Sequence, residues 1–186
     1  MNDLNWKILA STYLEKHPYF TARKDRCERQ DGKIVDPYYI VELPRSATAL
    51  AITEDNKVLL VKQYRHPIQQ TIIETPGGFI DEGEDHATGM KRELLEETGY
   101  EFNHIECLGA VAANPGVLDN FTDLFLATGG KKVKEQELDH NEEIEIMLVS
   151  MEELIEMVRT NRIVQSLHTN CILYGLMKLG KLNFAL

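Results

Sequence analysis

Cysteine pairs, long apolar runs and an excess of positive charge are all missing from this sequence of 186 residues. Its three cysteines, Cys27, Cys107 and Cys171, stand alone, which excludes a disulfide framework and a zinc knuckle. No stretch approaches the ~18 apolar residues that span a bilayer, and the N-terminus has no apolar run behind a basic segment. We therefore expect a soluble, cytoplasmic protein.

Acidic residues outnumber basic ones by 30 to 20, which gives a formal net charge of −10. Such a chain repels nucleic acid and anionic membrane surfaces, so we expect neither as a partner. It can act on a polyanionic substrate only if a cation is held at the site, so a metal cofactor is the first feature to look for. The six histidines are never three to five residues apart, which excludes helical zinc motifs such as H-E-x-x-H.

The 43% of hydrophobic residues suits one domain with its own core, preceded by an N-terminal arm. Strand-like segments occupy residues 6–14, 20–28, 38–43, 47–53, 58–64, 105–112, 121–127 and 144–149. The turn residues 30–33, Gln-Asp-Gly-Lys, predict that the arm is antiparallel. Single helices among these strands, without regular βαβ alternation, predict an α/β fold with a mixed sheet and helices packed against it.

Three helices are predicted. The first runs from about Asp85 to Thr98, with Gly99 where a left-handed cap is needed. The second begins at Ser150, which forms a capping box with Glu153. The third covers roughly residues 166–179.

The first helix carries a cluster of carboxylates. Glu93, Glu96 and Glu97 share one face, because positions i, i+3 and i+4 of a helix are neighbours. Like charges so placed repel each other, and a hard divalent cation such as Mg²⁺ would compensate for that repulsion. Arg92 is placed to hold a carboxylate in orientation. An arbitrary acidic run is more often a solvated face, so the cluster alone does not establish a site.

The preceding loop favours the metal site. Residues 75–78, Thr-Pro-Gly-Gly, predict a tight turn whose backbone can approach a ligand closely. Loop and helix match the pattern G-x5-E-x7-R-E-U-x-E-E-x-G-U over residues 78–100, where U is a bulky aliphatic residue. The matching positions are Gly78, Glu84, Arg92, Glu93, Leu94, Glu96, Glu97 and Gly99. At the final position the chain has Tyr100, which changes packing and leaves the acidic face untouched.

This segment resembles the signature of the Nudix hydrolases, which cleave nucleoside diphosphates linked to another moiety. The resemblance implies an α/β/α sandwich with a mixed sheet, in which the signature forms a loop, a helix and a loop that hold Mg²⁺ or Mn²⁺. It implies that Glu93 and Glu97 are metal ligands, that Gly77 offers its carbonyl, and that Glu96 is a third ligand or supports the others. Arg92 would orient these groups rather than bind the ion.

The resemblance extends over most of the chain, toward the branch that hydrolyses ADP-ribose and other nucleoside-diphosphate sugars. It rests on Gln63-Tyr64-Arg65, on the Glu-x-Pro-Gly-Gly of residues 74–78, and on a proline at the expected distance beyond the signature. The substrate-binding residues so implied are Arg65, Glu74 and Pro115. We further expect residues 1–45 to be a β arm that forms a homodimer and residues 46–186 to be the hydrolase domain.

Hydrolysis also needs a base for the attacking water, and similar enzymes take it from the signature or from an acidic loop before a later strand. Here that loop precedes Ile144, and Glu142 is the best match for a carboxylate that also ligates metal. The candidates for the base are Glu142, His140, Glu143 and Glu93.

The expected reaction splits ADP-ribose or another sugar nucleotide into a nucleoside monophosphate and a sugar phosphate. The alternatives are a Nudix enzyme for dinucleoside polyphosphates, capped RNA or damaged nucleotides, and a nucleotide-sugar-binding module without catalysis. The intact set of signature glutamates favours catalysis over the binding module.

Overall fold

The computed structural model describes residues 3–140 and 142–182. The chain divides into two compact units by its internal contacts. The first runs to Pro44 and includes Ala112–Phe121, and the second comprises Arg45–Val111 and resumes at Thr122. None of the helices in the described ranges has the length and apolar character that a membrane crossing requires.

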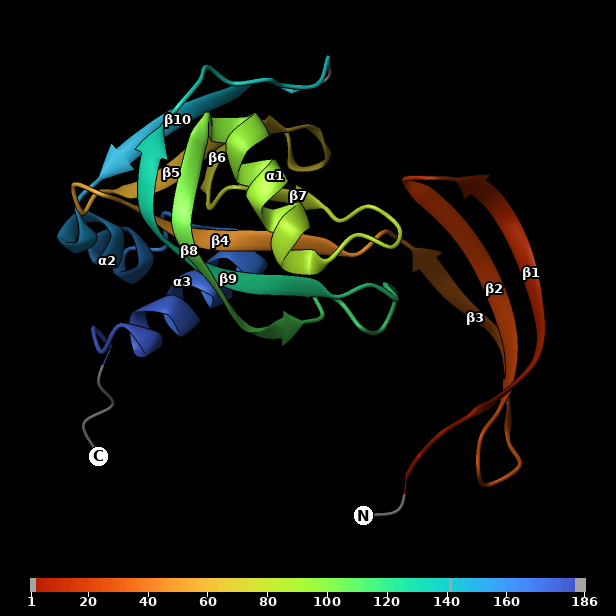
Figure 1. Ribbon diagram of the computed structural model, residues 1–186. Coiled ribbons are helices and arrows are strands. Elements are labelled where there is room, and N and C mark those ends of the chain that lie inside the picture. Colours follow the sequence, from red (N-terminus) through yellow and green to blue (C-terminus); the bar gives the residue numbers. More distant parts are fainter. Residues whose placement is uncertain (1–2, 141, 183–186) are drawn as a thin grey trace. The chain divides into compact units, whose positions relative to one another are not determined.

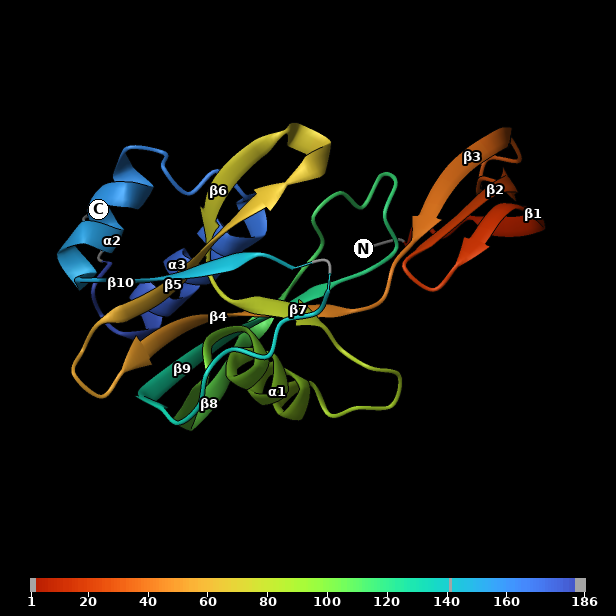
Figure 2. The ribbon, with the colours of Figure 1, turned by 90° about the horizontal axis from the view of Figure 1, so that it is seen from above.

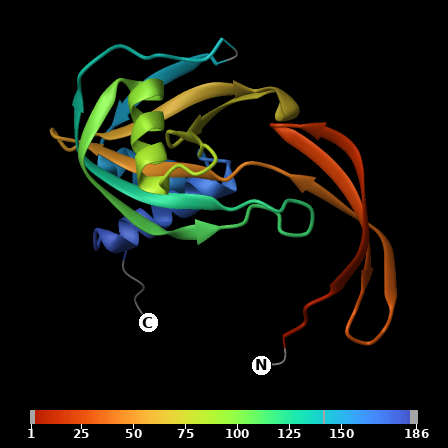
Figure 3. The ribbon, with the colours of Figure 1, turned by 45° about the vertical axis from the view of Figure 1, so that its right-hand side comes forward.

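The first unit is a three-stranded antiparallel sheet in the order β1-β2-β3 (Figure 3). Its strands are β1 (Lys7–His17), β2 (Phe20–Glu28) and β3 (Ile34–Glu42). Gly32, at a φ of 78°, lies in the turn between β2 and β3, as the polar turn predicts. The loop 112–121 joins this sheet through Tyr38 Oη, which donates to the Gly116 carbonyl at 3.0 Å, and through the Val41 amide.

The second unit is built on a seven-stranded mixed sheet, drawn in Figure 1. The strands are β4 (Ser46–Thr53), β5 (Val58–Arg65), β6 (Gln70–Glu74), β7 (Gly77–Phe79), β8 (Tyr100–Val111), β9 (Thr122–Lys132) and β10 (Ile144–Val149). The main path is β10-β5-β4-β9-β8, while β6 pairs with β5 and β7 with β4. Only the β4–β9 pair is parallel among the strand pairs of the described residues. A short 3₁₀ turn, His66–Ile68, links β5 to β6.

Helices cover both faces of this sheet (Figure 2). On one face α1 (His86–Thr98) buries Met90 and Leu94 against the alanines of β4 and against Phe125. On the other, α2 (Met151–Arg159) and α3 (Ser166–Lys178) pack on the leucines and valines of β4, β5 and β9. The two cores confirm the expected α/β/α arrangement with a mixed sheet and an antiparallel N-terminal arm.

The helix ends follow the local sequence. The Asp85 carboxylate accepts from the Thr88 amide at 3.0 Å and caps α1, and Gly99 ends that helix at a φ of 73°. The predicted capping box of α2 is complete, because Ser150 and Glu153 each bond the other's backbone.

Several strand predictions need correction. The strand predicted at 38–43 begins at Ile34, and the one predicted at 6–14 continues to His17. The strand predicted at 105–112 begins at Tyr100, and the one predicted at 121–127 continues to Lys132. Strands β6 and β7 had no counterpart in the prediction, and residues 77–79 form a strand where a turn was expected. A β-carbon on Gly77 would collide with the Ala47 carbonyl, so the missing side chain lets this segment pair with β4.

Candidate active site

Arg92 is the centre of the charged network on α1. Its Nη1 donates to Glu93 at 2.8 Å and to Glu96 at 3.0 Å. Its Nε and Nη2 donate to the two oxygens of Glu84, at 3.2 and 3.0 Å, and Nη2 also donates to the Phe79 carbonyl at 3.1 Å. These bonds raise the pKa of Arg92 and lower that of Glu84. Arg92 thus contacts three carboxylates at once, and its orienting role stays a prediction.

Glu97 is the buried member of the acidic face, and Glu93 is half-buried, with 14% of its side chain exposed. Burial is the main cause that raises the pKa of Glu93 to about 7 and that of Glu97 to about 8. The negative charge of Glu142 also raises both, so its carboxylate acts on the same site. Glu96, whose side chain is 40% exposed, lies at the outer edge. The helix thus holds two carboxylates where their charge is poorly solvated, which is costly without a cation.

Strand β7, which pairs with β4, lies over these carboxylates. The Gly77 amide donates to Glu97 Oε2 at 2.8 Å, and Glu97 is only 4% exposed. A β-carbon on Gly78 would run into the Glu93 carboxylate, so another residue here would displace that side chain from its present position. The two glycines of the loop therefore allow the backbone to lie directly on the acidic face.

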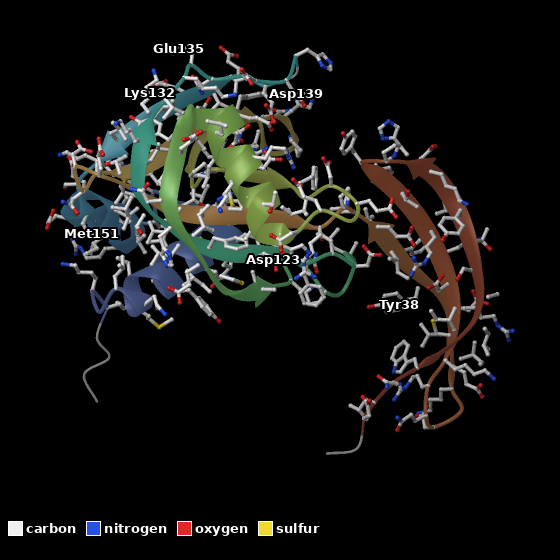
Figure 4. All side chains as sticks on the ribbon, in the orientation of Figure 1. Tyr38, Asp123, Lys132, Glu135, Asp139 and Met151 are labelled. Atoms are coloured by element: carbon white, nitrogen blue, oxygen red, sulfur yellow. The ribbon has the colours of Figure 1, made fainter. Side chains whose placement is uncertain are left out.

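The loop before β10 reaches the same site. In Figure 4 Asp139 marks this loop, and its amide donates to Glu142 Oε2 at 3.1 Å. Because Ile144 pairs with Gln63 in antiparallel register, the residues before Ile144 run alongside the end of β5, where Arg65 lies. The positive charge of Arg65 lowers the pKa of Glu97, against the larger effect of burial. His140 is exposed in the loop, and no hydrogen bond joins it to another described side chain.

The donor set suits a hard divalent cation. Among residues 3–140 and 142–182, no three acidic, imidazole or thiolate groups converge on one point with the side chains as they stand. Glu93 turns to Arg92 and Glu97 to the Gly77 amide. The available donors are carboxylate and carbonyl oxygens, and the carboxylates raise one another's pKa, so bound positive charge would relieve their repulsion.

Glu74 lies behind Arg65 rather than in the open part of the site. It is 1% exposed, its Oε2 accepts from Arg65 Nε at 2.9 Å, and its Oε1 lies 3.1 Å from His168 Nε2. Burial raises the pKa of this carboxyl, but the contacts with His168 and Arg65 outweigh burial and leave the pKa lowered. Both oxygens of Glu74 are thus engaged inside the protein.

Sequence reasoning missed two groups near the predicted residues. One is His168 on α3, which no local motif distinguishes from a core residue. The other is Asp123, labelled in Figure 4, which accepts from Arg45 Nε at 2.7 Å and lies 2.8 Å from His86 Nδ1. His86 in turn lines a cavity of about 380 Å³, together with Glu84, Asp85, Ala87, Cys107 and Phe125.

The structure brings together most of the predicted site residues on one unit: Arg65, Glu74, Gly77, Arg92, Glu93, Glu96, Glu97 and Glu142. Pro115 lies in the loop 112–121 of the other unit. Its assignment to substrate binding stays a prediction, as do the individual roles of the other residues.

Comparison with known families agrees with this geometry. A model of the Nudix domain matches residues 42–166, which include the whole acidic helix and its loop. The chain belongs to the Nudix family. A second model, described as a nucleoside diphosphate sugar hydrolase N-terminal domain, matches residues 6–41. Nudix hydrolases generally use divalent metal ions, in keeping with the donor set described above.

Several known proteins are similar over much of their length. An ADP-ribose pyrophosphatase of Bacillus subtilis (strain 168) is 32% identical over 158 residues, covering 77% of this chain and 85% of the relative. A methanol dehydrogenase activator of Bacillus methanolicus is 37% identical over 128 residues, covering 68% and 69%. The crystal structure of an ADP compounds hydrolase superposes with a TM-score of 0.82 at 17% identity, over 98% of this chain and 100% of that one. The last comparison establishes the shared fold.

Proposed function

We propose that this Nudix protein hydrolyses the diphosphate linkage of ADP-ribose or another nucleoside-diphosphate sugar, releasing a nucleoside monophosphate and a sugar phosphate. The observation that carries the proposal is a pair of carboxylates under a glycine loop, the half-buried Glu93 and the buried Glu97, on whose site the charges of Glu142 and Arg65 also act. The family match over residues 6–41 and the Bacillus subtilis relative support the sugar-nucleotide class.

Four groups are proposed to hold Mg²⁺ or Mn²⁺. They are the carboxylates of Glu93, Glu97 and Glu142 and the carbonyl of Gly77, with Glu96 as a further ligand or as support for the others. When bound, the ion supplies positive charge that stabilises the diphosphate and favours deprotonation of a water molecule. Arg92 keeps Glu93 and Glu96 in place through the hydrogen bonds from its Nη1.

The reaction consists of one displacement at phosphorus. A water oxygen forms a bond to phosphorus as the bond from phosphorus to the bridging oxygen breaks, and a base on the protein takes the proton of the water. The candidates for that base are Glu142, His140, Glu143 and Glu93. Arg65 is proposed to bind the diphosphate, because its side chain is 43% exposed and its charge acts on the acidic site. Glu74 contributes through Arg65, since both of its oxygens are engaged in the interior.

A substrate panel tests the function. ADP-ribose, ADP-glucose, GDP-mannose, UDP-glucose and diadenosine polyphosphates are each incubated with the protein and Mg²⁺, with Mn²⁺, and with EDTA, and products are identified by chromatography. We expect metal-dependent release of a nucleoside monophosphate from at least one sugar nucleotide. Turnover of the polyphosphates alone would replace the proposal with the dinucleoside alternative, and binding of ADP-ribose without any turnover would replace it with a binding module.

We also propose that residues 1–45 are a dimerisation arm, that residues 46–186 are the catalytic domain, and that the protein works in the cytoplasm as a homodimer. Every residue of β1 is exposed, and this strand carries the apolar residues Ile8, Tyr13 and Leu14, an arrangement that favours a protein partner. The three unpaired cysteines suit a reducing compartment. Light scattering should give the dimer mass, and Leu14→Asp should lower it, whereas Leu148→Asp, at an exposed leucine of β10, should not.

A further inference from the structure

His168 is a buried residue of α3, on the sheet face that lies away from α1, and both of its ring nitrogens are engaged. The residue is 7% exposed. Its Nε2 lies 3.1 Å from Glu74 Oε1, and its Nδ1 lies 2.7 Å from the Thr75 hydroxyl and 3.2 Å from that of Thr48. The two hydroxyls are 2.6 Å apart, and the Thr48 hydroxyl also donates to the Pro76 carbonyl at 3.0 Å. The imidazole is therefore fixed in orientation by contacts on both sides of the ring.

Glu74 connects the fixed imidazole of His168 to Arg65. Its carboxylate lies between the imidazole and the guanidinium of Arg65, with one oxygen used by each. Because the carboxylate is buried, it has no solvent to replace a lost partner. Removal of the imidazole would leave Oε1 without its partner and free the carboxylate to rotate away from Arg65.

Arg65 is the only member of this chain of contacts that is substantially exposed. Its Nε is used by Glu74, while its side chain remains 43% exposed at the end of β5, within the electrostatic reach of Glu97. A long side chain at the surface samples many rotamers unless one of its nitrogens is anchored. Among the described contacts of Arg65, the hydrogen bond to Glu74 is the one that supplies this anchor.

We propose that His168 is a positioning residue, which through Glu74 holds the Arg65 guanidinium where it binds the diphosphate of the substrate. The proposal rests on the function proposed above, because it takes Arg65 as a diphosphate ligand. The described partners of the His168 ring are Glu74, Thr75 and Thr48, and none of them is a proposed ligand of the metal or the diphosphate. Its effect on activity should therefore disappear when Arg65 is absent.

A double-mutant cycle measures this dependence. Steady-state kinetics are recorded for the wild type, His168→Ala, Arg65→Ala and the double variant, with the sugar nucleotide that the wild type turns over fastest. We expect His168→Ala to raise KM about tenfold with kcat changed by less than about threefold, as for the loss of one charge-assisted contact to the substrate. In the Arg65→Ala background the same change should alter KM by less than about twofold. Independent, multiplying effects in the double variant would overturn the proposal.

Two further variants separate positioning from packing. Cys171→Ala alters a fully buried side chain one turn further along α3. The described hydrogen bonds of Cys171 go to the carbonyls of Thr48 and Phe125 and not to Glu74. It should lower the melting temperature and leave KM unchanged. In His168→Gln the amide can still donate toward Glu74, so KM should stay close to that of the wild type. An equal rise of KM in Cys171→Ala would assign the effect to general destabilisation and refute the proposal.

A spectroscopic measurement needs no turnover and so tests the network apart from the proposed function. The Arg65 Nε–H, identified in a ¹H–¹⁵N spectrum by its loss in Arg65→Lys, should exchange slowly in the wild type and in Cys171→Ala. In His168→Ala it should shift and exchange quickly. If the wild type hydrolyses no sugar nucleotide, the proposed function is refuted. The Nε–H signal still reports whether His168 holds Arg65 through Glu74. An unchanged signal in His168→Ala would show that His168 does not hold Arg65.

Discussion

Two helices of this protein have almost the same charged composition and opposite environments. The charged residues compared are, in α1, Arg92, Glu93, Glu96 and Glu97 and, in α2, Glu152, Glu153, Glu156 and Arg159. In α1, burial raises the pKa of Glu93 to about 7 and that of Glu97 to about 8. In α2, hydrogen bonds from Ser150 lower the pKa of Glu153, and the hydrogen bond from Arg159 lowers that of Glu156.

The difference comes from what covers each helix. On α2 the carboxylates lie in solvent, cap the helix or pair locally, so they need no further partner. On α1 the loop of Gly77 and Gly78 lies against two carboxylates, so that Glu97 is buried and Glu93 is half-buried. An acidic run therefore becomes a candidate metal site only where the tertiary structure buries it. Each of the following predictions tests this contrast.

Metal removal should have the largest effect. We expect EDTA to abolish hydrolysis of sugar nucleotides, and added Mg²⁺ or Mn²⁺ to restore it, because the α1 carboxylates alone supply no positive charge for the diphosphate. The same ions should raise the melting temperature of the wild type, since they bind the folded site. Full activity in EDTA would contradict the metal assignment.

Glu97→Gln should have the second-largest effect on activity. Replacing this ligand with a neutral isostere should lower kcat roughly 100-fold or more, since several kcal/mol of transition-state stabilisation depend on the bound ion. The fold should persist, because the amide fits the same space. Glu156→Gln on α2 is the matched control, and its kcat should equal that of the wild type. Near-normal turnover in Glu97→Gln would remove Glu97 from the ligand set.

Arg92→Lys should have an intermediate effect. Lysine keeps the charge but cannot reproduce the bonds to Glu84, Glu93 and Glu96 together, so we expect kcat to fall about tenfold. Arg159→Lys on α2 should change neither kcat nor the melting temperature, because the pair it forms with Glu156 is exposed. Equal kcat values for the two variants would argue against an orienting role for Arg92.

The stability of the metal-free protein should depend on pH through α1. Glu93 and Glu97 have pKa values of about 7 and about 8 in the folded state, above the ordinary value of 4.5. Between these values the folded state binds more protons than the unfolded state, so the free energy of unfolding should fall as pH rises from about 5 to 8. Thermal melts in EDTA should show this slope in the wild type and in Glu156→Gln, and a smaller slope in Glu97→Gln. Parallel slopes in all three proteins would indicate that Glu97 titrates normally.

Ser150→Ala should have the smallest effect. It removes the cap of α2 and should cost about 1 kcal/mol of stability, the usual value for a lost N-cap. Denaturant unfolding measures this loss, while kcat and KM should stay unchanged. A fall in kcat would mean that α2 contributes to the site, which would weaken the contrast between the two helices.

The sequence predicted the elements whose signals are local. The carboxylates of α1 and its end at Gly99 follow from helical spacing and capping preferences, and the structure has them in place, with Asp85 as the N-cap. Strand β7 was missed because three residues with two glycines have little intrinsic preference for a strand, and pairing with β4 creates it. The contact between His168 and Glu74 could not be foreseen, since the two residues are distant in sequence and share no motif.

By itself, the sequence determined the helix boundaries, the acidic face of α1 and the family, because spacing, capping and the signature pattern are properties of neighbouring residues. Only the tertiary structure decided which carboxylates are desolvated and which residues stand behind Arg65. Burial depends on what packs above a side chain, and the glycine loop and α3 are brought to the site by pairing and packing that no local pattern encodes.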